Sequence, residues 1–106
     1  MKINGNIHVP DEAIEDFCRR WKIIQIEVFG SALREDFQPD SDVDLLVTFE
    51  KDARHSLFEI MHMEEEMAKL VGRPVDLIER AGVERSTNPY RRHAILSTAQ
   101  VVYRVA

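Results

Sequence analysis

The sequence has little of what marks several common classes of protein. Cys18 is the only cysteine among 106 residues, which excludes an internal disulfide and a zinc site built from cysteines. No apolar run approaches the roughly 20 residues of a membrane-spanning helix. Residues 1–5 also lack the apolar core of a signal peptide. We therefore expect a cytoplasmic protein in a reducing compartment.

Positive charge is also scarce. The formal net charge is -5, so autonomous nucleic-acid binding, which depends on neutralising phosphates with Lys and Arg, is not expected. The composition of 44% hydrophobic and 31% charged residues is typical of a globular protein. No repeat and no Pro/Gly/Ser-rich linker divides the chain. We expect residues 1–106 to form a single domain, because this length suits one hydrophobic core.

Hydrophobic periodicity predicts alternating helices and strands. Ile14, Phe17, Cys18 and Trp21 form one apolar helical stripe. Ser56 is expected to cap another helix, with the matching glutamate of a capping box three positions later. The predicted helices cover about residues 11–21, 32–36, 56–71 and 88–98, and the predicted strands cover 23–29, 42–49 and 74–78. Residues 101–103 are either a last strand or an extended tail. The fold class is therefore α/β (α+β), a small sheet covered by helices.

Two aspartates stand out at the start of the second strand. Because side chains alternate along a strand, Asp42 and Asp44 lie on the same face. Two carboxylates this close repel each other unless a cation lies between them, and oxygen ligands with open positions suit Mg²⁺. The alternative is that both are solvated residues at the start of a strand. The Asp-x-Asp pattern is common, so taken alone it favours this alternative.

The sequence around these aspartates favours a phosphate site. Gly30 and Ser31 follow the preceding strand and open a helical turn, where backbone N–H groups can bind a phosphate. Asp76 is a third acidic residue, in a short apolar strand where an unpaired carboxylate is costly. Together these residues predict a site for a magnesium-bound nucleoside triphosphate.

The combined spacing resembles the signature of the DNA polymerase β-like nucleotidyltransferase superfamily. The runs that carry it are Phe29–Arg34, Pro39–Val47, Leu70–Leu77 and Asn88–Tyr90. These runs are closer still to the minimal nucleotidyltransferases (MNT), which are stand-alone antitoxins paired with HEPN-domain toxins. The likeness covers most of the chain after about residue 23, and it implies the nucleotidyltransferase fold, with a mixed sheet.

The resemblance also implies a role for each site residue. Asp42, Asp44 and Asp76 would be catalytic and would hold Mg²⁺, two ions in all, with Asp76 also helping to activate the attacking hydroxyl. Gly30, Ser31 and Arg34 would bind the nucleotide, ATP or another triphosphate. The reaction would transfer a nucleoside monophosphate, AMP if ATP is the donor, to a hydroxyl such as a tyrosine of a partner HEPN toxin.

Two departures from the family pattern support an alternative function. Ala32 stands where many relatives have Arg, and Glu35 stands where many have Gly. A catalytically weak or inactive module that neutralises its partner by direct contact therefore stays open. So does an accessory subunit of a larger enzyme. The exposed edges of so small a sheet also leave a homo-oligomer open.

Several other polar residues are expected to be structural. His55 is interpreted as solvent-exposed, and residues 64–66 as a solvated helix face. For residues 91–93, we favour an exposed helical face narrowly over a basic contact with a partner or nucleotide. Cys18 is interpreted as a small buried apolar residue.

Overall fold

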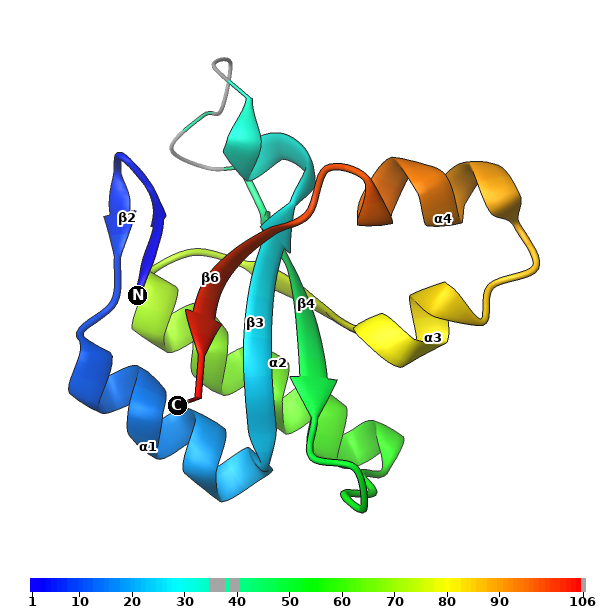
Figure 1. Cartoon of the computed structure of the whole chain (residues 1–106). Helices are drawn as coiled ribbons and strands as arrows, with labels where there is room; N and C mark the ends of the chain where they lie inside the picture. The colour runs from blue at the N-terminus through cyan, green and yellow to red at the C-terminus, as the bar shows by residue number, and fades with distance from the viewer. Residues whose placement is uncertain (35–37, 39–40, 106) are drawn as a thin grey trace.

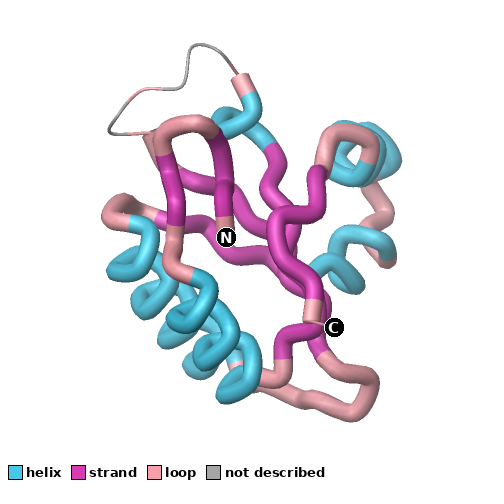
Figure 2. Tube along the Cα trace, turned by 60° about the vertical axis from the view of Figure 1, so that its left-hand side comes forward, coloured by secondary structure: helices cyan, strands magenta, loops and turns pink. Residues whose placement is uncertain are grey.

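The computed structural model describes residues 1–34, 38 and 41–105. A four-stranded mixed sheet in the order β5-β4-β3-β6 has helices on both faces (Figures 1 and 2). The sheet strands are β3 (Ile23–Phe29), β4 (Val43–Phe49), β5 (Val75–Glu79) and β6 (Gln100–Arg104). The remaining elements are the hairpin β1 (Lys2–Asn4) and β2 (Ile7–His8), the helices α1 (Asp11–Trp21), α2 (Leu57–Val71), α3 (Arg80–Glu84) and α4 (Pro89–Leu96), and the 3-10 helix η1 (Gly30–Leu33).

The sheet is mixed because of how its strands are connected. β3 pairs antiparallel with β4 on one side and with β6 on the other. β5 pairs parallel with β4, and α2 makes the long connection that two parallel neighbours require. β4 is therefore an interior strand with a partner along each side.

The two faces of the sheet have separate hydrophobic cores. Strand alternation sends Val28 and Leu45 to the face covered by α1 and α2, where both side chains are fully buried. The opposite face carries Phe29 and Leu46, which pack against residues of α3 and α4, namely Val83 and Ile95. Figure 2 shows the two pairs of helices on opposite sides of the sheet.

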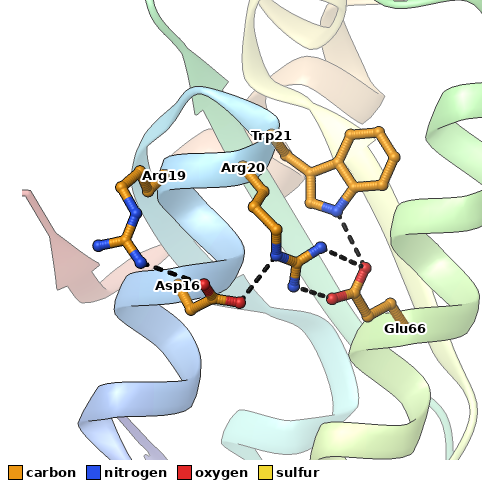
Figure 3. Close-up of polar contacts among 5 residues, drawn as sticks. All are labelled: Asp16, Arg19, Arg20, Trp21 and Glu66. Carbon is orange, nitrogen blue, oxygen red and sulfur yellow. Dashed lines mark hydrogen bonds and ion pairs between the residues drawn. The ribbon is translucent and has the colours of Figure 1, made fainter.

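A polar cluster joins α1 to α2 at the surface (Figure 3). Glu66 of α2 accepts a hydrogen bond from Trp21 Nε1 at 3.0 Å and forms an ion pair with Arg20. Arg20 Nε also donates to Asp16, one turn earlier, at 2.7 Å. The guanidinium therefore bridges a carboxylate of α1 and a carboxylate of α2.

The expected α/β fold with a helix-covered sheet is confirmed, with most of its element boundaries. The capping box at Ser56 is present, with Glu59 N donating to Ser56 Oγ at 3.2 Å and Ser56 N donating to Glu59 Oε1 at 2.9 Å. Residues 100–104 form a sheet strand, which settles the choice left open there. The helix expected at 32–36 is the 3-10 turn Gly30–Leu33, and residues 35–37 lie outside the described residues.

Two interpretations of polar residues were wrong. The His55 side chain is only 9% exposed: its Nε2 lies 2.8 Å from the Trp21 carbonyl, and its ring packs on Phe49. The acidic run on α2 is only partly solvated, because Glu64 accepts a hydrogen bond from the backbone N–H of Leu77 at 2.9 Å. In the described part of the chain, no helix is long and apolar enough to cross a bilayer.

Candidate active site

Asp44 lies in the middle of three adjacent strands. It is the second residue of β4, with Phe29, the last residue of β3, opposite it on one side and Asp76 of β5 on the other. The parallel register with β5 is continued one residue beyond the strand by the hydrogen bond from Val43 N to Pro74 O, 3.0 Å. Three chain segments thus place Asp44 and Asp76 side by side at one end of the sheet.

The turn after β3 packs directly on Asp44. Gly30 has a φ of +74°, in the left-handed region that favours glycine. A Cβ at this position would overlap Asp44 Oδ2, so only glycine fits. The backbone N–H of Ser31 donates to the Asp44 carboxylate, and Ser31 Oγ donates to the Asp42 carbonyl at 3.2 Å. The predicted Gly-Ser element and the predicted Asp pair therefore form one continuous structure.

The carboxylates of this site repel each other. Burial raises the pKa of Asp44, and the nearby charges of Asp76 and Asp42 raise it further. The Ser31 N–H and the charge of Arg34 oppose that rise, but the net direction is upward. A site in which an aspartate is held against two others is one that a bound cation stabilises.

The three aspartates differ in exposure. Asp44 is half-buried, whereas Asp42 and Asp76 are exposed. Alternation along β4 puts Asp44 on the same face as Leu46, which is the face covered by α3 and α4. Asp44, and Asp76 in register beside it, therefore lie on this face at the end where β4 and β5 begin.

The donor set fits magnesium by its chemistry. All the candidate ligands are carboxylate oxygens, the type that Mg²⁺ prefers, and the absence of a Cβ at Gly30 lets the Asp44 carboxylate lie directly against the turn. Within the residues that the structure describes, no three Asp, Glu, His or Cys side chains converge tightly enough to hold one ion. Mg²⁺ does not need such a cage, because it is usually bound through one or two carboxylates plus water and phosphate oxygens.

Arg34 lies at the end of the same turn. Its backbone N–H donates to the Ser31 carbonyl at 3.0 Å, its side chain is exposed, and its charge acts on Asp44. This is the position expected of a residue that binds a phosphate. Glu35, the second of the two departures from the family pattern, lies outside the described residues.

A cavity beside Arg34 contains residues that the sequence analysis did not identify. Its volume is about 410 Å³, and its polar lining includes the amide side chains of Asn4, Asn6 and Gln100. The hairpin β1–β2 and the start of β6 bring these amides to the turn from the two ends of the chain. These three residues form no recognisable motif in the sequence, so their proximity to the turn is seen only in the structure.

A larger cavity of about 610 Å³ lies at the other end of β4 and β5, lined by Thr48, Glu79 and the basic side chains Lys51, Arg54, Arg80 and Arg85. None of the predicted site residues lines it. The carboxylate pair is therefore the better candidate for the chemistry, although its surroundings are more open.

Comparison with known proteins identifies the family. The sequence model of the nucleotidyltransferase domain family matches residues 10–102. The chain belongs to that family. The nucleotidyltransferase that the sequence predicted is thus confirmed at the level of family and fold.

Individual relatives are more specific. The protein adenylyltransferase MntA of Thermococcus cleftensis is 38% identical over 70 residues, which cover 66% of this chain and 69% of that one. A solved structure provisionally described as a minimal nucleotidyltransferase is 31% identical, with a TM-score of 0.61 over 84% of this chain and 85% of its own.

A third similar structure is a complex. It contains a tri-AMPylated Shewanella oneidensis HEPN toxin and an MNT antitoxin. The likeness has a TM-score of 0.57 at 17% identity and covers 89% of this chain and 69% of that one. At this identity it shows a shared fold alone.

Proposed function

We propose that this chain transfers AMP from ATP to a hydroxyl of a partner protein, acting as a single-domain antitoxin on a HEPN-type toxin. The observation that carries the proposal is the contact between the Gly30–Ser31 turn and Asp44, with Asp76 in register beside it. The adenylyltransferase relative and the AMP-modified toxin in the similar complex support AMP as the group transferred and a HEPN protein as the acceptor. A tyrosine is the acceptor that the family resemblance suggests.

The residues have distinct tasks in this reaction. Gly30 and Ser31 bind the terminal phosphates with backbone N–H groups and the Ser31 hydroxyl, while Arg34 adds positive charge. Asp42, Asp44 and Asp76 would hold Mg²⁺, which, when bound, stabilises charge on the attacking and leaving oxygens.

The transfer itself is a substitution at phosphorus. The acceptor oxygen forms a bond to the α-phosphorus as the bond from that phosphorus to the β-bridging oxygen breaks, and pyrophosphate leaves. The hydroxyl proton passes to the Asp76 carboxylate, which is exposed and therefore accessible to an incoming acceptor. Positioning and charge neutralisation supply most of the rate enhancement.

The test uses ATP labelled at the α-phosphate, Mg²⁺ and a co-expressed HEPN-domain protein. We expect wild type to label the acceptor and the Asp42→Asn/Asp44→Asn variant to leave it unlabelled, and γ-labelled ATP should give no label with either. Equal labelling by wild type and by the double variant would exclude the proposal. Circular dichroism checks that the variant is folded.

One observation favours the alternative of a module that acts by contact alone. Ala32, where many relatives carry an arginine, is only 3% exposed and packs in the core beneath the turn. This position therefore supplies no cation to a triphosphate. If the Asp42→Asn/Asp44→Asn variant neutralises the toxin as well as wild type does, contact is sufficient and transfer is not the means of neutralisation.

A further inference from the structure

The turn that begins with Gly30 and Ser31 has little internal support. It is a single 3-10 turn of four residues, with a hydrogen bond from Arg34 N to the Ser31 carbonyl at 3.0 Å. Short 3-10 turns have poor hydrogen-bond geometry. Within the described part of the chain, no side chain caps this one. The conformation of Gly30 and Ser31 therefore depends on contacts with other segments.

One of these contacts comes from the N-terminal hairpin β1–β2, which lies beside η1 (Figure 1). Asn4, the last residue of β1, donates from Nδ2 to the Ala32 carbonyl at 3.1 Å, across 28 positions of the chain. Ala32 directly follows Ser31, whose backbone N–H donates to the Asp44 carboxylate. The turn is thus attached to the strand of Asp44 through Ser31 and to the hairpin through Ala32.

The two hydrogen bonds of the Asn4 side chain need both a donor and an acceptor. Oδ1 accepts from the backbone N–H of Asn6 at 2.8 Å, while Nδ2 donates to Ala32. A backbone N–H can only donate and a carbonyl can only accept, so one orientation of the amide satisfies both partners. A carboxylate of the same shape would satisfy Asn6 but would set an oxygen against the Ala32 carbonyl. The bond to Asn6 also orients the amide toward the turn.

The hairpin that presents Asn4 is fixed to the main core. Strands of three and two residues do not make a stable hairpin by themselves. Here the hairpin is held by apolar side chains that are each at most 4% exposed, namely Met1, Ile3, Ile7 and Val9. The Val9 N–H also donates to the Met1 carbonyl at 2.8 Å. The amide therefore reaches the turn from an anchored element.

We propose that Asn4 is a positioning residue for nucleotide binding. Through the Ala32 carbonyl it holds the Gly30–Ser31 turn in the shape that accepts the phosphates of the nucleoside triphosphate. This inference rests on the proposed function, because it concerns the same nucleotide. The hairpin precedes residues 10–102, which the family model matches, so the model does not include this support.

The experiment measures binding without requiring transfer. Calorimetric titrations use magnesium ATP and magnesium tripolyphosphate, which has the phosphates but no nucleoside. Asn4→Asp keeps the acceptor for the Asn6 N–H and loses the donor to Ala32, whereas Asn4→Ala loses both. The control, Asn6→Asp, adds the same charge in the same cavity, at an exposed side chain to which the described residues give no hydrogen bond. Thermal denaturation without ligand records stability separately.

We expect both Asn4 variants to bind each ligand about tenfold more weakly than wild type, the order expected for one hydrogen bond. Asn6→Asp should bind as wild type does. In ¹⁵N–¹H NMR spectra without ligand, the amide signals of Ser31 and Ala32 should shift in Asn4→Asp and stay in place in Asn6→Asp.

Several results would overturn the proposal. If both Asn4 variants keep wild-type affinity while their melting temperatures fall, the hydrogen bond serves the fold alone. If Asn6→Asp weakens binding equally, or if Asn4→Ala binds as wild type does, the added charge near Arg34 is the cause. A loss of ATP affinity with unchanged tripolyphosphate affinity would mean that Asn4 acts on the nucleoside and not on the turn.

The outcome is separable from that of the transfer assay. A protein whose ATP affinity depends on Asn4 but which never labels its acceptor supports the positioning role and contradicts the transfer reaction. A protein that labels its acceptor, with the same KM for ATP in wild type and both Asn4 variants, contradicts the positioning role alone. If Asn4 positions the turn, these variants should raise KM for ATP about tenfold and leave KM for the acceptor unchanged. A wild type that binds neither ligand overturns both proposals.

Discussion

Gly30 and Asp44 are in such close contact that the turn after β3 and the carboxylate on β4 cannot be changed independently. A methyl group at Gly30 would occupy the position of Asp44 Oδ2, and the φ of +74° disfavours any other residue. The shape of the Gly30–Ser31 turn and the position of the central carboxylate are thus set by one contact.

Replacing this glycine should affect both stability and activity. We expect Gly30→Ala to lower the free energy of unfolding by about 1–2 kcal/mol from backbone strain alone. We also expect it to reduce AMP transfer at least tenfold, because Asp44 must move. Urea denaturation and labelling with α-labelled ATP measure the two effects.

Gly72 provides the matched control. It also has a positive φ, +85°, but a Cβ there would meet nothing within 4 Å. Gly72→Ala should therefore show the strain penalty and leave transfer unchanged. If both variants lose transfer equally, the close approach to Asp44 is not what the site requires.

The ion pair between α1 and α2 should make stability depend on pH. The hydrogen bonds from Arg20, and then from Trp21, lower the pKa of Glu66 below its ordinary value of 4.5. A lowered pKa stabilises the folded state above that value, and the contribution is lost as the pH falls through the pKa of the folded state. We expect Glu66→Gln to cost about 1 kcal/mol at pH 7, because the pair is partly exposed.

Urea denaturation at several pH values tests this. The difference between wild type and Glu66→Gln should shrink as the pH falls below 4.5. Glu65→Gln is the control, since Glu65 is exposed on the same helix and the described residues give it no partner. A pH-independent difference for Glu66→Gln would show that its charge is not the stabilising feature.

The buried pair of Glu27 and Arg80 should be sensitive to the loss of one partner. Both carboxylate oxygens of Glu27 lie 2.7 Å from Arg80 Nη1, and the glutamate is only 4% exposed. Arg80→Met leaves a buried charge without its cation and should cost about 3 kcal/mol.

Adding Glu27→Gln to Arg80→Met should recover most of that loss, because the uncompensated charge is removed. The free energies from chemical denaturation form a double-mutant cycle that measures the coupling. Arg85→Met, at an exposed residue to which the described part of the chain gives no hydrogen bond or ion pair, should change stability by less than about 0.5 kcal/mol. Additive effects of the two changes at the buried pair would contradict the interpretation.

Magnesium and ATP together should stabilise wild type. A ligand at about 100 times its Kd adds roughly 2.7 kcal/mol, which raises the melting temperature by about 10 °C or more for a domain of this size. Asp42→Asn/Asp44→Asn should lose most of this increase, and EDTA should abolish it for wild type. An EDTA-resistant increase would show that the triphosphate binds without a metal.

The sequence correctly predicted the features that depend on residues close to one another along the chain. The capping box at Ser56, the end of α2 at Gly72 and the paired aspartates at the start of β4 each follow from residues within a few positions of one another. The short apolar strand predicted Asp76 as a third acidic residue, but its place beside Asp44 depends on the pairing of β5 with β4. The family pattern added Arg34, at the end of the turn after β3.

What the sequence did not predict depends on contacts between distant segments. His55 was expected in solvent, but its ring is covered by Trp21 and Phe49 from two other elements. The hairpin β1–β2 is too short for hydrophobic alternation to be visible, with strands of three and two residues. Helix α3 has only five residues and no side chain that caps its first turn, so the sequence contains no pattern that predicts it.

The pairing of β3 with β6 has a consequence for how the protein is made. Gln25 and Arg104 are 79 positions apart, so this contact closes a long loop and forms late, whereas β3, β4 and β5 lie closer together along the chain. During synthesis the strands that carry the carboxylates emerge from the ribosome before β6 does. Until β6 emerges, the outer edge of β3 is open to strands of other chains. A truncation before residue 100 would thus keep the strands that carry Asp44 and Asp76 while increasing aggregation.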